Sequence, residues 1–296
     1  WLDAANYNFT HQTSTTADIS AKPVTVTGIS SSNKVYDRST VATVDATGID
    51  ETGIGILAAD TGTVEITASG VFSDRNVGNT KTVTLTSSVT GADASNYNFT
   101  HQASTTANIS AKPVSVTGIT ASSKVYDGLA IAAVDVSGID ETGIGILAAD
   151  TGTVEIVTNG QFSDKHVGNG KTVTLTSSVT GADASNYNFT HQASTTANIT
   201  AKPVSVSGII ALNKTYDGTT DVSVDDSGAS GWVTGDDVTV SATGVFSDKK
   251  VETGKPVSLT SSVSGTDTSN YIFTHQGSTT ADIIAKFIIV KGSTAE

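Results

Sequence analysis

The sequence predicts an all-β protein made of tandem β-sandwich repeats, with Ig-like or β-grasp-like topology, arranged end to end as an elongated rod. Three observations predict this. Apolar and hydroxyl residues alternate along many short segments, the same segments return about every 90 residues, and only 6% of the 296 residues are aromatic. That supply of large apolar side chains suits several small cores better than one large core.

The alternation has a period of two, which is typical of strands with one buried and one solvated face. Clusters rich in Gly, Asn and Asp punctuate it and predict turns. We expect seven or eight short strands in each repeat, and no helix longer than one turn, at Leu57–Asp60. The clearest alternating segments are Val24–Thr27, Thr63–Thr67, Thr82–Thr86 and Tyr97–Phe99, and the turn clusters are Val77–Thr80 and Thr90–Asp93.

Two motifs define the repeat. Ala21-Lys22-Pro23-Val24 returns at 111–114 and 201–204, and Lys34-Val35-Tyr36-Asp37 returns at 124–127 and, with one change, at 214–217. We therefore divide the chain into residues 1–20 as the C-terminal tail of a preceding repeat, 21–110 as repeat 1, 111–200 as repeat 2, 201–284 as repeat 3 and 285–296 as the start of a divergent unit.

Repeat 3 is shorter because one loop differs. Residues 48–60 return intact at 138–150, whereas repeat 3 has the shorter Gly228–Asp237. A loop that changes length between copies is expected to be exposed. The joint at 109–114 has no Gly/Ser linker, and Pro113 favours an extended Lys112, so we expect a semi-rigid connection in which each repeat's partners are its neighbours.

Composition excludes several classes of partner. With 29 acidic and 16 basic residues, the net charge of −13 disfavours nucleic acid and anionic membrane surfaces. There is no Cys, so neither disulfides nor thiolate metal sites are available, and there is no Met. No signal peptide or apolar membrane span is recognisable, and we interpret the chain as a monomeric internal part of a longer exported protein.

No constellation for catalysis or cofactor binding is predicted, and the chain is not expected to be an enzyme. His11, His101, His191 and His275 share a Thr-His-Gln context and are interpreted as structural. Asp74-Arg75-Asn76 resembles a calcium loop, but its copies at 164–166 and 248–250 carry Lys and His166, which favours an ordinary turn. No metal ligand is assigned, and calcium at repeat joints or at Asp236-Asp237 is a minor alternative.

Two further hypotheses concern single residues. A self-formed isopeptide bond would join a first-strand lysine to an amide or carboxyl group of the last strand, although a solvated lysine is the expected case. Trp232 is expected to cover the core of repeat 3, with stacking on a sugar ring as the alternative. The isopeptide candidates are Lys22, Lys112 and Lys202 with Asn108, Asn198 and Asp282.

Several segments resemble the YDG domain, which is repeated in large bacterial exported adhesins, including filamentous-haemagglutinin-like proteins. They are Lys124–Gly128, Gly235–Val238, Phe246–Lys249 and Gly91–Tyr97. The sequence departs from the pattern at Arg38, where the family has Gly, and at 59–62, where Ala-Asp-Thr-Gly replaces Gly-Asp-Asp.

The resemblance implies an extracellular, all-β protein of the bacterial cell surface with a role in adhesion or biofilm. We expect a structural stalk, or spacer, that projects a binding region from the cell. The alternative is that each repeat is a weak module for host or matrix glycans or proteins acting by avidity, with the loop at 48–60 as its site. A glycoside-active enzyme would need paired carboxylates that we cannot place.

Overall fold

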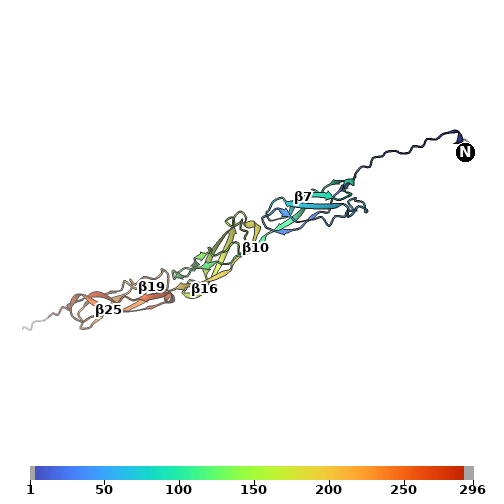
Figure 1. The fold of residues 1–296 in the computed structure, drawn as a ribbon. Helices are drawn as coiled ribbons and strands as arrows, with labels where there is room; N and C mark the ends of the chain where they lie inside the picture. Colours follow the sequence, from blue (N-terminus) through green and yellow to red (C-terminus); the bar gives the residue numbers. More distant parts are fainter. Residues whose placement is uncertain (1–3, 290–296) are drawn as a thin grey trace, which may run out of the picture. The chain divides into compact units, whose positions relative to one another are not determined.

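A computed structural model describes residues 4–289 of the chain (Figure 1). It contains two compact units. Unit 1 holds the residues up to Val114 together with Gly145–Val154 and Gly181–Phe189, and unit 2 holds Ser115–Ile144, Glu155–Thr180 and the residues from Thr190 onward. The division passes through repeat 2, because two of its loops belong with repeat 1.

Repeat 1 is all-β, and its nine strands exceed the expected seven or eight. Six of the nine are only two to four residues long and arise from pairing that alternation alone does not reveal. The strands are β1 (Lys22–Thr25), β2 (Ser30–Ser31), β3 (Lys34–Val35), β4 (Val41–Ala42), β5 (Val44–Asp45), β6 (Glu65–Phe72), β7 (Gly78–Thr90), β8 (Tyr97–Thr100) and β9 (Ser104–Ser110), with the 3-10 helix η2 (Ala94–Asn96) before β8.

The other two repeats carry the same elements. In repeat 2 they are β10 (Lys112–Ser115), β11 (Thr120–Ala121), β12 (Lys124–Val125), β13 (Ile131–Ala132), β14 (Val134–Asp135), β15 (Glu155–Phe162), β16 (Gly168–Thr180), η3 (Ala184–Asn186), β17 (Tyr187–Thr190) and β18 (Ser194–Thr200). In repeat 3 they are β19 (Lys202–Ser205), β20 (Ile210–Ala211), β21 (Lys214–Thr215), β22 (Asp221–Val222), β23 (Val224–Asp225), β24 (Thr239–Phe246), β25 (Glu252–Ser264), η4 (Thr268–Asn270), β26 (Tyr271–Thr274) and β27 (Ser278–Ile284).

Each repeat has one five-stranded mixed sheet, with the order β3-β9-β7-β6-β4 in repeat 1. The pairs β9-β7, β7-β6 and β6-β4 are antiparallel, while β3 is parallel to β9. Two short ladders complete the repeat: β1 runs parallel to β8, and β2 runs antiparallel to β5. The central strands β7, β16 and β25 are 13 residues long (Figure 1 labels all three).

Apolar and hydroxyl residues alternate along the central strand, and the apolar ones point into the core. In β7, Val83 and Leu85 are buried while the threonines beside them are exposed. Repeat 1 has a separate apolar cluster between its short ladder and its loops, made of Val24, Ile56, Val64 and Tyr97. The main core of repeat 3 gathers Val206, Ile209, Val240, Phe246, Val257, Leu259, Ala281 and Ile283.

The turn predicted at Val77–Thr80 is wrong, because β7 begins at Gly78 and runs through it. A bulge between Gly78 and Lys81 absorbs the irregularity. At the bulge Thr80 has a φ of 49°, and its backbone N–H donates to Oδ1 of Asn108 at 2.7 Å. The side chain of Asn108 thus satisfies a backbone group that the ladder leaves unpaired.

The two flanking segments form no strand within the described residues. Residues 7–20 repeat the sequence of β8 and β9 closely but are extended and exposed, and Ala4–Asn6 forms the 3-10 helix η1. Residues 285–289 also lie outside any strand, and the rest of the divergent unit, 290–296, lies outside the described residues. The reason is pairing: β8 needs β1, and β9 needs β7 and β3.

Candidate functional site: the joints between repeats

The repeated Lys-x-Tyr-Asp motif builds a rigid turn. The ammonium of Lys34 donates to the carbonyl oxygens of Ser39 and Val41 at 2.9 and 3.1 Å, and it forms an ion pair with Asp37 at 2.7 Å. The same ammonium lies 5.7 Å from the centre of the Phe72 ring. This turn fixes the position of Tyr36, which lies between its lysine and its aspartate.

The position after the aspartate requires a left-handed backbone. Its φ is 67° at Arg38, 82° at Gly128 and 85° at Gly218. Glycine adopts this conformation without a steric penalty, whereas a side chain there costs free energy. Arg38 is therefore strained, and its guanidinium contacts described below give a structural reason for its presence.

In unit 1, Tyr36 forms a joint with loops of repeat 2. Its hydroxyl donates to Oδ2 of Asp150 at 3.0 Å, and the hydroxyl of Tyr187 donates to the same oxygen at 2.6 Å. The rings of Tyr36 and Tyr187 pack edge to face with centroids 5.5 Å apart. Tyr36 is 1% exposed and Asp150 is fully buried, so water does not compete for these bonds.

Cations from repeat 1 balance the acidic groups of this joint. Nη1 of Arg38 lies 2.9 Å from Oδ1 of Asp150, an ion pair in which that oxygen accepts no hydrogen bond. The guanidinium of Arg38 also donates to the carbonyl oxygen of Ala149. Arg75 pairs with Asp183 at 3.3 Å. A buried carboxylate without such a partner would be strongly destabilising.

A backbone contact completes the joint of unit 1. The N–H of Val77 donates to Oδ1 of Asn186 at 3.0 Å, and Nδ2 of Asn186 donates to the side chain of Asn76 at 3.3 Å. Asn186 is 2% exposed. Its side chain therefore fixes the orientation of the turn at residues 74–77 against repeat 2.

Unit 2 contains a second joint of the same design. Tyr126 donates to Oδ2 of Asp236 at 2.8 Å, and Tyr271 donates to the same oxygen. The ammonium of Lys165 binds the other oxygen, Oδ1, at 2.9 Å. The N–H of Val167 donates to Asn270 at 3.1 Å, and the rings of Tyr126 and Tyr271 lie 5.4 Å apart. Lys165 thus takes the place that Arg38 and Arg75 share in the joint of unit 1.

The environment of the joints shifts the pKa of several groups. Burial and the hydrogen bond to Asp150 raise the pKa of Tyr36 to about 12. Burial and the bond to Asp236 likewise raise the pKa of Tyr271. Burial alone would raise the pKa of Asp236, but hydrogen bonds from Tyr271, Lys165 and Tyr126 outweigh it and hold the pKa below its usual range. At neutral pH the joint of unit 2 therefore joins two neutral tyrosines to an ionised Asp236 that is paired with Lys165.

We name the two halves of a joint the tyrosine end and the aspartate end. The tyrosine end carries a tyrosine, a cation and a backbone N–H, and the aspartate end carries two aspartates, an asparagine and a second tyrosine. In unit 1 the tyrosine end is Tyr36, Arg75 and Val77 and the aspartate end is Asp150, Asp183, Asn186 and Tyr187. In unit 2 they are Tyr126, Lys165 and Val167 with Asp236, Asp267, Asn270 and Tyr271.

The loop that changes length was expected to be exposed, and this is wrong for two of its residues. Ile56 is 3% exposed and belongs to the apolar cluster of repeat 1. Asp150, in the copy of the loop, is fully buried in the joint of unit 1. The loop varies in length around these two anchors, since the shorter loop of repeat 3 still supplies Asp236.

The residues considered for calcium have other partners. Asp74 accepts the N–H of Asn76 and the ammonium of Lys81, which makes the segment a turn closed by an ion pair. Asp236 is occupied by two tyrosine hydroxyls and a lysine. Within residues 4–289, no group of three His, Asp or Glu residues is placed to hold a metal ion.

The histidines of the Thr-His-Gln segments lie on the surface, and the glutamine beside them is the structural residue. His101 shares a hydrogen bond with Ser87 at 2.7 Å, and His275 does the same with Ser261. Gln102 bonds both the N–H and the carbonyl of Ile29, at 3.0 and 2.8 Å.

The isopeptide candidates are held apart by topology. Lys22 on β1 lies beside Tyr97 of β8, and its ammonium donates to the carbonyl oxygen of Gly55 at 2.5 Å. Asn108 lies on β9, in the five-stranded sheet. In repeat 3, Lys202 lies beside Tyr271 on the short ladder. The last-strand residues Asn108, Asn198 and Asp282 each accept a backbone N–H at the bulge of the central strand.

The prediction for Trp232 is confirmed, because it packs against the main core of repeat 3. The joints themselves were missed. Tyr36 and Asp150 are 114 residues apart, farther than one repeat, so no local pattern connects them. The available signal was the return of a tyrosine, an aspartate and an asparagine at the repeat spacing, although polar residues of that kind are usually solvated.

Comparison with known protein families divides the chain into the same three repeats as the strands do. No curated protein matches the chain, and no helix within residues 4–289 is both long and apolar enough to cross a bilayer. The YDG domain matches three times, at residues 20–107, 110–197 and 200–281. Each match contains one tyrosine end and one aspartate end, and together the matches cover most of the sequence. The chain therefore belongs to the YDG domain family.

Proposed function

We propose that this chain is a spacer segment of a bacterial cell-surface adhesin, in which tandem repeats form an elongated, semi-rigid rod that projects a binding region from the cell. The observation that carries the proposal is the use of the repeated motif. The tyrosines of the first two Lys-x-Tyr-Asp motifs, Tyr36 and Tyr126, are each 1% exposed and contact the following repeat.

A spacer needs joints that resist bending and do not rely on a flexible linker. Here β9 ends at Ser110 and β10 begins at Lys112, so a single residue separates the two strands. Tyrosine, aspartate and asparagine contacts then add orientation-specific bonds at the same joint. Stability in such an array is the sum of the stabilities of the repeats and of their interfaces, so length increases without a new binding site.

Small-angle scattering of the chain tests this proposal. A compact particle of this length would have a radius of gyration of about 19 Å. Three sandwich-like repeats placed end to end would give about 30–40 Å. We expect the larger value both with calcium and with chelator, because the joint carboxylates already have cationic or hydroxyl partners. A compact particle would contradict the spacer proposal.

A variant tests whether the joints supply the stiffness. Tyr126→Ala removes the ring and the hydroxyl from the joint of unit 2, and we expect a broader distribution of conformations with a smaller mean radius of gyration. Tyr216→Ala is the matched control, because Tyr216 is 37% exposed and contributes to neither joint. Equal scattering from both variants would show that the joint contacts do not stiffen the chain.

The alternative, a weak glycan- or protein-binding module in each repeat, placed its site in the loop at 48–60. Deleting that loop is a poor test, since it would remove Ile56 from the core. Substitution of the exposed Leu57 leaves the core intact. Loss of adhesion on Leu57→Ser, with unchanged scattering and unfolding, would favour the binding module over the spacer.

A further inference from the structure

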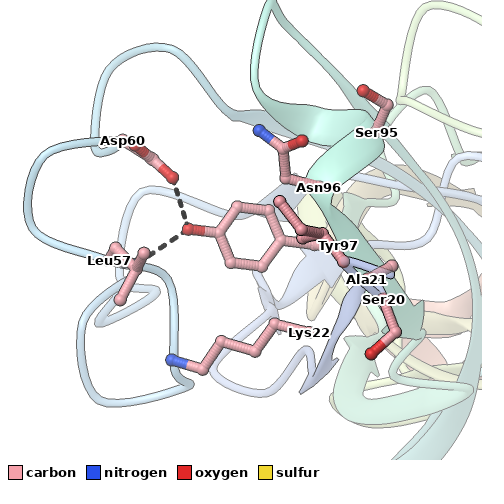
Figure 2. Close-up of a pocket in the computed structure, with 9 residues that line it drawn as sticks. Ser20, Ala21, Lys22, Leu57, Asp60, Ser95, Asn96 and Tyr97 are labelled. Atoms are coloured by element: carbon pink, nitrogen blue, oxygen red, sulfur yellow. Dashed lines mark hydrogen bonds between the residues drawn. The ribbon is translucent and has the colours of Figure 1, made fainter. Parts of the chain in front are cut away.

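Two hollows of the described residues differ in character. One lies in repeat 1 beside Asp60 and Tyr97, at the aspartate end of that repeat, and has a volume of about 300 Å³ (Figure 2). Its polar groups already bond one another, since Tyr97 donates to Asp60 at 2.6 Å and accepts the N–H of Leu57 at 3.0 Å. The other lies on the solvated face of the five-stranded sheet of repeat 2 and has a volume of about 410 Å³.

Three neighbouring strands form the hollow of repeat 2. β13 contributes Ile131, β15 contributes Asn159 and Gln161, and β16 contributes Thr174 and Thr176. The strand register places Ile131, Gln161 and Thr174 in one row, and it places Asn159 beside Thr176 in the next. Because side chains at paired positions point to the same face of a sheet, all five surround one spot on the solvated face.

The floor of this hollow is main chain. Ala132 is 5% exposed, and a Cβ built at Gly160 would lie 3.3 Å from the Cβ of Ala132, so both positions face the core. Ile131, by contrast, is 69% exposed and forms an apolar wall. The hollow thus combines an apolar side, a peptide floor and a rim of amides and hydroxyls.

The polar side chains of the rim have no protein partner. Across residues 4–289, the side chains of Asn159, Gln161 and the two threonines make no hydrogen bond to another protein group. The counterparts of Asn159 in repeats 1 and 3 do make one, because Ser69 and Thr243 each donate to a carbonyl oxygen of the central strand at 3.5 Å. The amides of repeat 2 are therefore available to a ligand.

The hollow is also a place where repeat 2 departs from repeat 1. Residues 171–199 repeat residues 81–109 without a change, and the two threonines belong to that identical stretch. The other three side chains of the hollow all differ. Repeat 1 has Val41, Ser69 and Val71 where repeat 2 has Ile131, Asn159 and Gln161. Repeat 1 thus offers the same sheet with a rim that lacks both amides.

This chemistry selects an uncharged ligand rich in hydroxyl groups. None of the residues that line the hollow is charged, and the net charge of −13 disfavours an anion. An amide both donates and accepts, so Asn159 and Gln161 can bond a hydroxyl group in either sense. A sugar ring presents such hydroxyls around an apolar CH face, and the volume falls within the range of small-ligand pockets.

We infer that the hollow of repeat 2 is a binding subsite for one sugar residue of an uncharged glycan. Asn159 and Gln161 would bond its hydroxyl groups, and Ile131 would pack against its CH face. No aromatic ring lines the hollow, so a single site should be weak, with a Kd on the order of 1 mM.

This subsite is separate from the joints and from the loop at 48–60. Repeat 2 lies between two repeats in the sequence, and none of the joint contacts described above involves the residues of the hollow. The inference goes beyond the spacer proposal and does not depend on it. A chain that scatters as a rod and binds no sugar would retain the spacer and overturn the subsite.

Saturation-transfer NMR on the full chain tests binding. The probes are neutral trisaccharides of glucose, galactose, mannose or N-acetylglucosamine at about 10 mM, with sialyllactose as the anionic probe and a hexapeptide of Gly, Ser and Thr as the neutral peptide. We expect a signal from at least one neutral trisaccharide and none from the other two probes. No signal from any neutral trisaccharide, or a stronger signal from sialyllactose or the peptide, would overturn the inference.

Repeat 1 supplies the matched variant. Asn159→Ser together with Gln161→Val gives repeat 2 the residues that repeat 1 carries in the same sheet, so the fold should be retained. We expect the affinity for the trisaccharide that binds best to fall about 10-fold or more, because two hydrogen-bonding amides are lost. Leu57→Ser, in the exposed loop of repeat 1, is the control and should leave the affinity unchanged. Equal affinity in both variants would overturn the subsite.

The reciprocal exchange tests whether the three side chains suffice. Val41→Ile, Ser69→Asn and Val71→Gln together should create a second subsite in repeat 1, and chemical-shift mapping with the same trisaccharide should then show shifted amides in β6 as well as in β15. In the native chain the shifts should be confined to β13, β15 and β16. Shifts confined to other strands of the native chain would overturn the assignment.

Discussion

Replacing the same tyrosine by phenylalanine in different repeats isolates the contribution of one joint. Tyr36→Phe removes a hydroxyl that donates to the buried carboxylate of Asp150 at 3.0 Å and leaves the ring packing in place. Hydrogen bonds to charged groups contribute about 1.5–3 kcal/mol, and this one is shielded from water. Tyr216→Phe is the matched control, since that ring is 37% exposed, and should change stability by less than about 0.5 kcal/mol.

Calorimetric unfolding of the full chain measures both variants. For a domain of about 90 residues, 1 kcal/mol shifts the unfolding midpoint by roughly 4–8 °C, so we expect a fall of at least about 6 °C for Tyr36→Phe. Hydrogen exchange gives a local reading at Val77, whose N–H donates to Asn186 in the same joint. That amide should exchange about 10-fold to 100-fold faster in Tyr36→Phe.

The result that would refute this reasoning is an equal response at positions 36 and 216. It would mean that the hydroxyl of Tyr36 adds nothing beyond what an exposed tyrosine adds. A double-mutant cycle with Asp150→Asn provides an internal check. If Tyr36 acts through Asp150, the two losses should not be additive.

The remaining predictions concern pH and two structural residues. Because the folded-state pKa of Asp236 is lowered, its joint should contribute its full stabilisation above the unfolded pKa of about 3.9. That stabilisation should be lost as the pH falls through the folded-state pKa. Calorimetry over an acid titration should show this loss in the native chain and not in the Asp236→Asn variant. The raised pKa of Tyr36, about 12, gives the opposite sign: its contribution is complete below pH of about 10 and is lost between about 10 and 12, which circular dichroism would follow against Tyr36→Phe. Gly91→Ala should destabilise repeat 1 by more than about 3 kcal/mol in urea unfolding, because its φ is 120° and a Cβ would lie 2.0 Å from the carbonyl oxygen of Thr63. Gln102→Ala removes three hydrogen bonds to backbone groups, two to Ile29 and one to Ser104, and should cost about 2 kcal/mol in the same assay. An unchanged midpoint would deny the glutamine a structural role.

Local pattern predicted the all-β character of the repeats because the alternating segments carry their own information. Val83 and Leu85 are buried and their threonine neighbours are exposed, as a period of two requires. The turn at Val77–Thr80 was predicted wrongly because a bulge keeps a Gly/Asn cluster inside a strand. Only the partner strand and the side chain of Asn108 distinguish that bulge from a turn.

One sequence in two settings shows the limit of local prediction. Tyr-Asn-Phe-Thr forms a strand at residues 97–100, where Tyr97 is 7% exposed. The same four residues at 7–10 form no strand, and Tyr7 is 68% exposed. The difference is the parallel partner β1, which β8 has and residues 7–10 do not have within the described residues.

The joints escaped prediction for a related reason. A buried aspartate is rare, and the sequence does not reveal which aspartates acquire a cation and two hydroxyls from elsewhere in the chain. Asp60 and Asp150 stand in identical sequence contexts, yet only Asp150 meets Tyr36 and Arg38. Whether the aspartate at this position is buried therefore depends on contacts from the neighbouring repeat.

The shorter loop of repeat 3 has a consequence for how such chains change length over evolution. Six residues are missing from that repeat relative to the 90 of the others, yet Asp236 still meets Tyr126. Because every repeat carries one half of a joint at each end, duplication or deletion of a whole repeat joins the same two halves again. An exchange between positions that are not equivalent in the two repeats would leave a buried carboxylate without its cation. Copy number can therefore vary by whole repeats, while the register of the exchange is constrained by the aspartate of each joint.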